Sequence, residues 1–430
     1  MSLFSFPRRT VLLIVGAVII TLAGVVVAIN FMGGEKKIEQ HIDRHYSLED
    51  PRFLNELGVL LGPPFIAGNR HQVLQNGDEI FPAMLAAIRG ARTSITFESY
   101  IYWSGDIGRE FAASLVERAR SGVKVQVLLD WVGSAKMDEA LIDAMKVAGV
   151  QVRKFHPPHW SHLGRLNNRT HRKILVVDGR IAFTGEVGIA PQWSGHAQDP
   201  DHWRDTHFQV EGPVVAQMQA VFLDNWIKVT GDVLHGPDYF PPLKTAGQGR
   251  AQVFSSSPTG GSESMQLMYL LAITAASRSI DLSASYFVPD ELAVREMVEA
   301  MKRGVKLRIV VPGEHIDSET VRSASRAKWG PLLEAGAVIA EYNPTMFHCK
   351  VMIVDDLLVS VGSTNFDNRS FRLNDEATLN IVDPGFASEQ TTIFEADLGR
   401  SRLITYAQWR DRPFKEKIGE RLASLFGSQL

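Results

Sequence analysis

The longest uninterrupted apolar run of the chain lies near its N-terminus. From Val11 to Ile29, Thr21 is the only polar side chain. A helix over this run would be about 29 Å long, close to the hydrocarbon thickness of a bilayer. The apolar region of a cleaved signal peptide is usually shorter, about 7–15 residues, and no A-x-A-like cleavage site follows here. We therefore expect residues 1–32 to form a retained anchor that spans the membrane at about residues 11–31.

The charges that flank this run do not fix its orientation. Arg8 and Arg9 precede it, and Lys36 and Lys37 follow it. Because basic residues favour the cytoplasmic side, this balance leaves the orientation open. The expected location is the cell membrane, with a single pass.

After a connector, residues 33–63, which is polar to about Asp50, strand-like and helix-like segments alternate. The strand-like segments are rich in β-branched and aromatic residues, whereas the others have the apolar spacing of a helix. The expected strands are Ser94–Trp103, Val123–Val132 and a pair around an Asp-Gly turn in Lys173–Gly185, and the expected helices are Gly108–Gly122 and Met137–Gly149. Strands that alternate with helices predict an α/β fold built in layers.

The second half of the chain repeats this pattern. A loop rich in proline and glycine, Pro237–Arg250, separates the halves. Three segments then recur in the same order, each about 180 residues after its counterpart, a spacing far longer than a solenoid repeat. The recurring segments are Ser279–Val288, Arg303–Gly313 and His348–Asp356. We expect a duplicated α/β domain, with copies at residues 64–240 and 241–430.

Each half contains one His-x-Lys-x-x-x-x-Asp motif. The first comprises His171, Lys173 and Asp178, and the second His348, Lys350 and Asp355. On a strand, positions i and i+2 share a face, so each His and Lys should point the same way, with Arg172 and Cys349 pointing oppositely. Imidazole beside ammonium suits a phosphate group, because one can attack or donate a proton while the other neutralises charge. Two copies at matching places argue strongly against a chance origin.

These motifs and their surroundings resemble the phospholipase D superfamily, most closely its bacterial cardiolipin synthases. The similarity runs from about Pro64 to the C-terminus and includes ESYIYW, GVKVQVLLD, NNRTHRKILVVDG, SYFVPD, EYNPTMFHCKVMIVDD and VGSTNFDNRSFRLNDE. The resemblance implies two phospholipase D-like α/β/α sandwich domains that form a pseudo-two-fold bilobal enzyme. Both motifs should then meet at one cleft.

The resemblance also implies roles for particular residues. One histidine attacks phosphorus to form a phosphohistidine, and the other acts as acid and base. By resemblance these are His171 and His348, although the sequence alone leaves their order open. The lysines should stabilise the transition state, and both motif aspartates, at turns after the strands, should give support and orientation. The remaining expected roles are phosphate contact for Ser363 and Asn365, and imidazole orientation for Glu376 and, in the first half, Asp205.

One segment departs from the family pattern. The first motif is usually followed by Gly-Gly-x-Asn, but this chain has Gly185, Glu186, Val187 and Gly188. We expect Glu186 to point away from the site and Asn365 to suffice for phosphate binding. The alternative is that Glu186 alters substrate choice or reduces activity.

The favoured function is a membrane-bound phosphatidyltransferase that makes cardiolipin from two phosphatidylglycerols through a phosphohistidine. A hydrolytic phospholipase D, a phosphodiesterase acting on nucleic acid and a non-catalytic membrane scaffold are the alternatives. The net charge of −3 argues against nucleic acid as a partner. We expect no cofactor, no metal and no obligate protein partner; His156–His162 has several histidines, but their spacing matches no usual zinc pattern.

Overall fold

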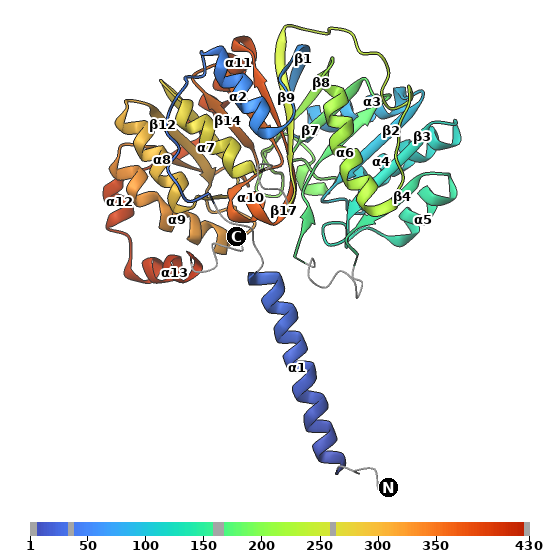
Figure 1. The fold of residues 1–430 in the computed structure, drawn as a ribbon, viewed down its shortest axis with the longest axis horizontal. Helices are drawn as coiled ribbons and strands as arrows, with labels where there is room; N and C mark the ends of the chain where they lie inside the picture. Colours follow the sequence, from blue (N-terminus) through green and yellow to red (C-terminus); the bar gives the residue numbers. More distant parts are fainter. Residues whose placement is uncertain (1–6, 33–37, 158–166, 259–263, 425–430) are drawn as a thin grey trace.

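The structure, a computed structural model, describes residues 7–32, 38–157, 167–258 and 264–424. Helix α1 (Arg8–Met32) projects from the rest of the chain (Figure 1). Its described side chains are mostly exposed, and by length and composition it is able to cross a membrane. The expected apolar helix is therefore present.

The first half of the chain forms one lobe, on the right in Figure 1. Its elements are β1 (Ile66–Gln75), α3 (Asn76–Gly90), β2 (Ser94–Ser99), α4 (Asp106–Arg120), β3 (Lys124–Asp130), α5 (Glu139–Val147), β4 (Gln151–Phe155), β5 (Arg169–Thr170), β6 (Ile174–Val177), β7 (Ile181–Gly185), η2 (Pro191–Trp193), β8 (Thr206–Glu211) and α6 (Val215–Thr230). Strands β2, β3 and β4 are parallel, whereas β6, β7, β8 and β1 continue the sheet with antiparallel pairs.

The second half forms the other lobe with the same strand pattern. Its elements are β9 (Gly249–Ser256), α7 (Met265–Ala275), β10 (Ser279–Ala284), β11 (Phe287–Val288), α8 (Glu291–Lys302), β12 (Lys306–Pro312), α9 (Glu319–Glu334), β13 (Val338–Tyr342), β14 (Lys350–Val354), β15 (Leu358–Gly362), β16 (Phe366–Asp367), α10 (Asn368–Arg372), β17 (Asn374–Val382), α11 (Pro384–Gly399), β18 (Ser401–Ile404), α12 (Tyr406–Arg410) and α13 (Phe414–Ser424). Parallel β10, β12 and β13 correspond to β2, β3 and β4. The duplication predicted from the repeated segments is confirmed.

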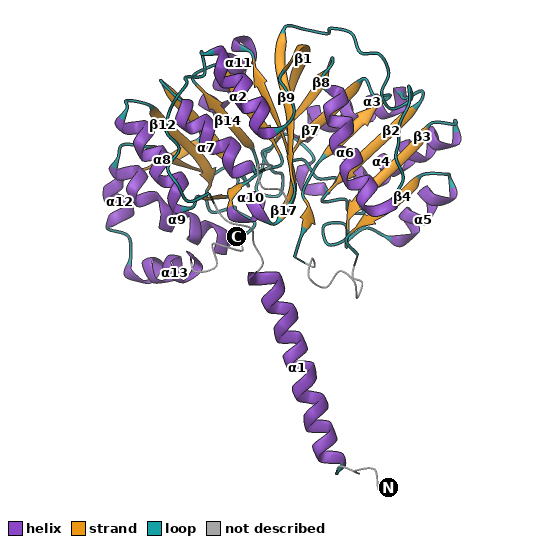
Figure 2. Ribbon diagram, viewed as in Figure 1, coloured by secondary structure: helices purple, strands orange, loops and turns teal. Residues whose placement is uncertain are grey.

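The two lobes share one sheet. Its order is β18-β13-β12-β10-β14-β15-β17-β9-β1-β8-β7-β6-β2-β3-β4, and β1 pairs with β9 where the halves meet. Helices cover both faces of this sheet (Figure 2). The mixed α/β architecture agrees with the α/β/α layers expected from the sequence.

A buried core joins the lobes to each other. Each lobe has its own apolar core, and a third contains Val176 and Phe208 from the first half together with Val351 and Leu379 from the second. Burial of apolar side chains from both halves in one cluster stabilises the lobes against each other. The site between them therefore lies on a rigid support.

The expected connector contains a helix that was not predicted from the sequence. Helix α2 (Pro51–Leu61) lies within residues 33–63, and its Leu57 and Leu61 are buried in the core of the second lobe. Ile38 and Tyr46 pack against the same core. The amphipathic spacing of α2 explains its docking, since one face of the helix is apolar. The N-terminal part of the body thus belongs structurally to the second lobe.

Candidate active site

Backbone pairing between the lobes places both motif histidines. Strand β5, which ends just before His171, runs parallel to Asn374–Asp375 of β17, and the His171 N–H donates to the Asp375 carbonyl at 2.9 Å. Reciprocally, the His348 N–H donates to the Arg204 carbonyl at 2.8 Å. Each histidine therefore lies beside a segment of the opposite lobe, which is the segment that carries its carboxylate partner.

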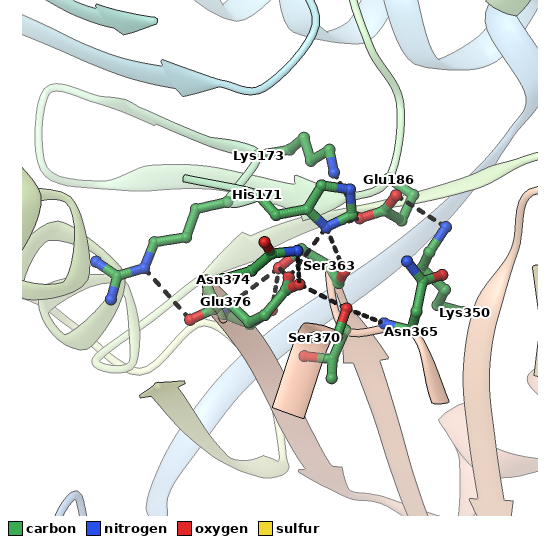
Figure 3. Close-up of polar contacts among 12 residues, drawn as sticks. His171, Lys173, Glu186, Lys350, Ser363, Asn365, Ser370, Asn374 and Glu376 are labelled. Atoms are coloured by element: carbon green, nitrogen blue, oxygen red, sulfur yellow. Dashed lines mark hydrogen bonds and ion pairs between the residues drawn. The ribbon is translucent and has the colours of Figure 1, made fainter. Parts of the chain in front are cut away.

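The His171 ring is fixed in one tautomer. Its Nδ1 lies 2.9 Å from the Ser363 carbonyl oxygen and 3.1 Å from Glu376 Oε2 (Figure 3). A carbonyl oxygen only accepts hydrogen bonds, so Nδ1 carries the proton. The other ring nitrogen, Nε2, then holds the lone pair that a nucleophile needs. His171 also lies edge-on to the Tyr100 ring, at 5.0 Å between centroids.

The His348 ring is oriented by Asp205. Its Nδ1 lies 2.9 Å from Asp205 Oδ2, which also accepts from Trp193 Nε1 at 2.8 Å, while the Thr206 N–H donates to Asp205 Oδ1. Trp193 and Trp203 pack against the imidazole with centroid distances of 5.4 and 5.2 Å. The expected orienting roles of Asp205 and Glu376 fit this geometry, and both act across the lobe boundary.

Burial shifts the pKa of both histidines and of both carboxyl groups that orient them. Desolvation, reinforced by the nearby lysines, lowers the pKa of His171 to about 3 and holds the pKa of His348 well below its ordinary value. Burial raises the pKa of Asp205 to about 6 and that of Glu376 to about 7. Both imidazoles are therefore neutral at pH 7 in this structure.

Glu186 lies between the two motif lysines. Its Oε1 is 2.8 Å from Lys173 Nζ, and its Oε2 is 2.8 Å from Lys350 Nζ (Figure 3). The same carboxylate is 3.7 Å from His171 Nδ1 and 3.8 Å from His348 Nδ1. The expectation that Glu186 points away from the site is wrong. The ion pairs supply the partner that a buried charge requires.

The backbone at Gly185 explains why the regular alternation of side chains along a strand does not predict the position of Glu186. Strand β7 pairs with β6 so that Thr184 lies opposite Ile174. Continued regularly, this register would put Glu186 on the side of Arg172, away from the motif lysines. Gly185 has φ 150°, and a Cβ there would lie 2.5 Å from the His207 ring. A glycine at this position breaks the alternation and turns Glu186 into the site.

The motif aspartates lie at the far ends of their strands. Asp178 accepts from the backbone N–H groups of Arg92, Thr93 and Ser94 at 2.8–3.1 Å. Asp355 accepts from the equivalent residues Ser277, Arg278 and Ser279 at 2.6–2.9 Å. Neither lines the central cavity. Both therefore support the turns that precede β2 and β10, and direct chemistry by either aspartate is not compatible with this placement.

The two expected phosphate-contacting residues differ in position. The Ser363 hydroxyl is fully buried, donates to Glu376 Oε2 at 2.5 Å and accepts from the Ala377 N–H at 2.9 Å. It does not line the cavity and holds Glu376 in this structure, and the expected phosphate contact by Ser363 stays a prediction. Asn365 does line the cavity, with its Oδ1 accepting from the Ser285 hydroxyl at 2.9 Å.

One cavity of about 500 Å³ unites the site residues. His171, Lys173, Glu186, His348 and Asn365 face it from both lobes. Aromatic side chains form much of the remaining wall, namely Tyr100, Trp103, Trp193, Trp203 and Tyr286. Such a wall of rings with a few convergent polar groups is typical of a small-molecule or lipid-headgroup site.

Three further site residues lie within segments that carry the family resemblance, although the sequence assigns them no individual role. Ser370 and Asn374 donate to Glu376 Oε1 at 2.7 and 3.2 Å, and Tyr100 packs on His171. Ser370 lies in α10, Asn374 begins β17 and Tyr100 follows β2, so their roles depend on how these elements pack together. Among the described residues, no group of His, Cys, Asp and Glu has the arrangement of a metal site. Positions 158–162 of the segment His156–His162 lie outside the described residues.

Comparison with known proteins agrees with the motifs. A family described as "Cardiolipin synthase, PLD-like domain" matches residues 84–202 and 269–398. The cardiolipin synthase of Geobacillus kaustophilus (strain HTA426) is 35% identical over 370 residues, which cover 85% of this chain and 74% of the relative. The chain belongs to the cardiolipin synthase family of phospholipase D-like proteins. It is accordingly a phosphatidyltransferase of the phospholipase D type.

Two further comparisons agree with this family assignment. Cardiolipin synthase A of Pseudomonas syringae pv. syringae (strain B728a) is 35% identical over 365 residues, covering 84% of this chain and 75% of the relative. A solved phosphatidylserine synthase from Haemophilus influenzae Rd KW20 has a TM-score of 0.66 at 14% identity, covering 88% of this chain and 99% of that chain. At 14% identity this likeness shows a shared fold, which extends over most of both chains.

Proposed function

We propose that this phosphatidyltransferase makes cardiolipin from two phosphatidylglycerols, with release of glycerol, through a phosphohistidine at His171. The observation that carries the proposal is the pair of carboxylate-oriented imidazoles, one from each lobe, that face one cavity. Two histidines at one site can divide the work of nucleophile and acid–base catalyst. The different hydrogen-bond partners of the two rings favour one assignment of these two roles.

The partners of each ring favour His171 as the nucleophile. The Ser363 carbonyl keeps the proton on Nδ1 of His171, which leaves Nε2 free to attack phosphorus. His348 is held at Nδ1 by the Asp205 carboxylate, and this arrangement can stabilise an imidazolium. The two rings therefore suit different steps.

In the first step, His171 Nε2 attacks the phosphorus of one phosphatidylglycerol. A P–N bond forms, the P–O bond to the glycerol headgroup breaks, and the departing oxygen takes a proton from His348 Nε2. Burial disfavours the protonated form of His348, and the anionic phosphodiester supplies the neighbouring negative charge that favours it. Lys173 and Lys350 stabilise the charge that develops on the phosphoryl oxygens.

In the second step, the headgroup hydroxyl of another phosphatidylglycerol is the acceptor. His348 removes its proton, the alkoxide oxygen attacks phosphorus, and the P–N bond to His171 breaks. Cardiolipin leaves and the enzyme returns to its starting state. The aromatic wall, including Trp103 and Trp203, favours an amphiphilic alcohol over water as the acceptor.

Helix α1 supplies the membrane attachment in this proposal. Its apolar length matches a bilayer, and both substrates are insoluble lipids. An enzyme held at the bilayer meets its donor and acceptor at high local concentration. The proposed location is therefore the cell membrane, with α1 as a single-pass anchor.

The test is lipid analysis of the full-length protein reconstituted in vesicles that contain phosphatidylglycerol. Cardiolipin and glycerol in equal amounts are expected with wild type and absent with His348→Ala. The exposed His196, which pairs with Asp78 outside the cavity, provides the control His196→Ala. Phosphatidic acid as the sole product would make the protein a hydrolase, and turnover by His348→Ala would exclude the two-histidine mechanism.

The covalent intermediate is tested separately. Phosphatidylglycerol labelled at phosphorus is mixed with enzyme, the reaction is stopped with alkali, and peptides are mapped. Label on the peptide that contains His171 is expected. Label on the His348 peptide would reverse the assignment, and transfer without any labelled histidine would exclude the phosphohistidine.

A further inference from the structure

The C-terminal helix α13 exposes its apolar side. Phe414, Ile418 and Leu422 are 75%, 44% and 57% exposed. Their spacing of four residues places them along one stripe of the helix. A surface helix of a globular protein normally turns such a stripe to the core, so the outward orientation needs a reason.

The inward side of α13 is polar. Glu420, which is buried, accepts from Arg412 Nη2 at 2.5 Å and lies 3.4 Å from Arg326 Nε. Glu416 lies 3.2 Å from the same Arg326 guanidinium. The only other buried residue of the described helix is the small Ala423. Ion pairs thus hold α13 on α9 with its apolar stripe directed outwards.

Basic side chains border the exposed stripe. At about 100° per residue, Lys415 lies on one side of the stripe, and Lys417 and Arg421 lie on the other. A cavity of about 410 Å³ opens beside the helix, lined by Trp409, Arg410, Arg412, Lys417 and Arg421 among others. An apolar stripe flanked by Lys and Arg is the pattern of helices that lie in the plane of an anionic membrane surface.

The end of α13 lies close to the attachment point of α1. Ser424, the last residue of α13, lines one cavity together with Ile38 and Glu39. Residues 33–37 join Met32 of α1 to Ile38, and a chain extends at most about 3.6 Å per residue, so Ile38 lies within about 22 Å of the end of α1. Figure 1 shows α13 on the side of the body from which α1 projects.

We propose that α13 is an interfacial helix that lies in the surface of an anionic lipid bilayer. Phe414, Ile418 and Leu422 enter the boundary of the acyl chains, and the basic residues beside them bind lipid phosphates. The body is then held at two points, α1 and α13, which fixes its orientation on the membrane. This inference rests on α1 being a membrane anchor and is independent of the proposed reaction.

The test places an environment-sensitive fluorophore on the helix. The full-length variant Ile418→Cys is labelled with a nitrobenzoxadiazole dye after reconstitution in phosphatidylcholine vesicles with 30 mol% phosphatidylglycerol, roughly a typical anionic fraction for surface binding. The natural Cys349 is buried, and burial raises the pKa of its thiol to about 12, so the dye should not label it. Val59→Cys in α2 is the control, because Val59 is also apolar and 74% exposed, but α2 lies on the opposite side of the body (Figure 1).

The expected result is a blue-shifted, several-fold brighter emission at position 418, quenched by lipids with spin labels on their acyl chains. The label at position 59 should remain water-like and unquenched. Equal, water-like emission at both positions would overturn the proposal. Brightening at 418 that depends on protein concentration and resists the lipid quencher would indicate a second copy of the chain and would also overturn it.

The charge requirement is tested with the same label. Replacing Lys415, Lys417 and Arg421 by Gln should reduce quenching at 418 at least several-fold. The label at 418 in a helix that keeps these three residues should show the same reduction in vesicles of phosphatidylcholine alone. Quenching that is insensitive to both changes would overturn the anionic-surface assignment. Because the signal needs no turnover, His348→Ala should give the same label result, which separates failure of this inference from failure of the proposed reaction.

Discussion

His348 and Asp205 come from different lobes and are joined by a 2.9 Å hydrogen bond between Nδ1 and Oδ2. The relationship is reciprocal, since Glu376 of the second lobe lies 3.1 Å from His171 Nδ1 of the first. Each motif histidine thus takes its hydrogen-bonded carboxylate from the other lobe. A single chain carries both pairs only because its lobes pack against each other.

Asp205→Asn should lower kcat by about 10²–10⁴-fold with little change in KM, because the imidazole loses the carboxylate that orients it and stabilises its proton. Cardiolipin formation in vesicles with varied phosphatidylglycerol content gives both constants. Asp78→Asn, at an exposed pair with His196, is the control and should leave both constants unchanged. A loss confined to KM would contradict the orienting role.

Glu186→Gln should make the site more attractive to dianions. The two lysines and Glu186 together carry a net charge of about +1, which matches a phosphodiester, whereas the variant carries about +2. We expect the inhibition constant for phosphatidic acid, a phosphomonoester, to fall about 10-fold or more, with a smaller change in KM for phosphatidylglycerol.

Inhibition of cardiolipin formation by added phosphatidic acid measures this effect. Glu211→Gln, at an exposed pair with Arg70, is the matched control, and thermal unfolding verifies that each variant is folded. If Glu186→Gln leaves the inhibition constant for phosphatidic acid unchanged relative to the KM for phosphatidylglycerol, charge matching by Glu186 is excluded.

The pH dependence should follow the orienting carboxyl groups. Their ionised forms accept the Nδ1 protons, and the pKa values are raised to about 6 for Asp205 and about 7 for Glu376. Activity should therefore fall as the pH decreases from about 7 to 6, while His171, with a pKa of about 3, remains neutral. A kcat/KM profile whose acid limb lies near pH 3–4 would contradict this assignment.

The same two carboxyl groups affect stability in the opposite sense. Their pKa values in the folded protein lie above the ordinary value of about 4, so the folded state binds more protons between about pH 4 and 7. Their contribution to the free energy of unfolding therefore decreases as the pH rises through this window. Glu376→Gln removes one such group, so the unfolding temperature of this variant should vary less with pH than that of wild type.

Arg172→Ala should destabilise the protein strongly. The guanidinium is fully buried, donates to the Val221 and Ser256 carbonyls, and pairs with Asp224 and Asp375. Removing one partner of a buried ion network costs about 3–5 kcal/mol, which corresponds to a fall in unfolding temperature on the order of 10 °C. Differential scanning fluorimetry measures this change. Arg70→Ala, at an exposed ion pair, should shift the midpoint by no more than about 2 °C.

Much of this protein follows from local sequence. The strand pair around Asp178 and Gly179 was predictable because an Asp-Gly turn joins two apolar runs, and both residues do adopt positive φ. The apolar composition of Val11–Ile29 predicts α1 in the same way. The two His-x-Lys motifs indicate the proposed reacting groups, because i, i+2 spacing on a strand places both side chains on one face.

The tertiary structure decided how these groups are combined. The sequence indicates Asp205 and Glu376 as carboxylates but not that each serves the histidine of the other lobe. This arrangement depends on β5 pairing with β17 and on the bridge between Arg204 and Phe347. The position of Glu186 depends on the turn at Gly185, and the membrane-facing stripe of α13 depends on which side of the helix meets α9. Local spacing determines which face a residue occupies, whereas only the packing of distant segments determines what that face meets.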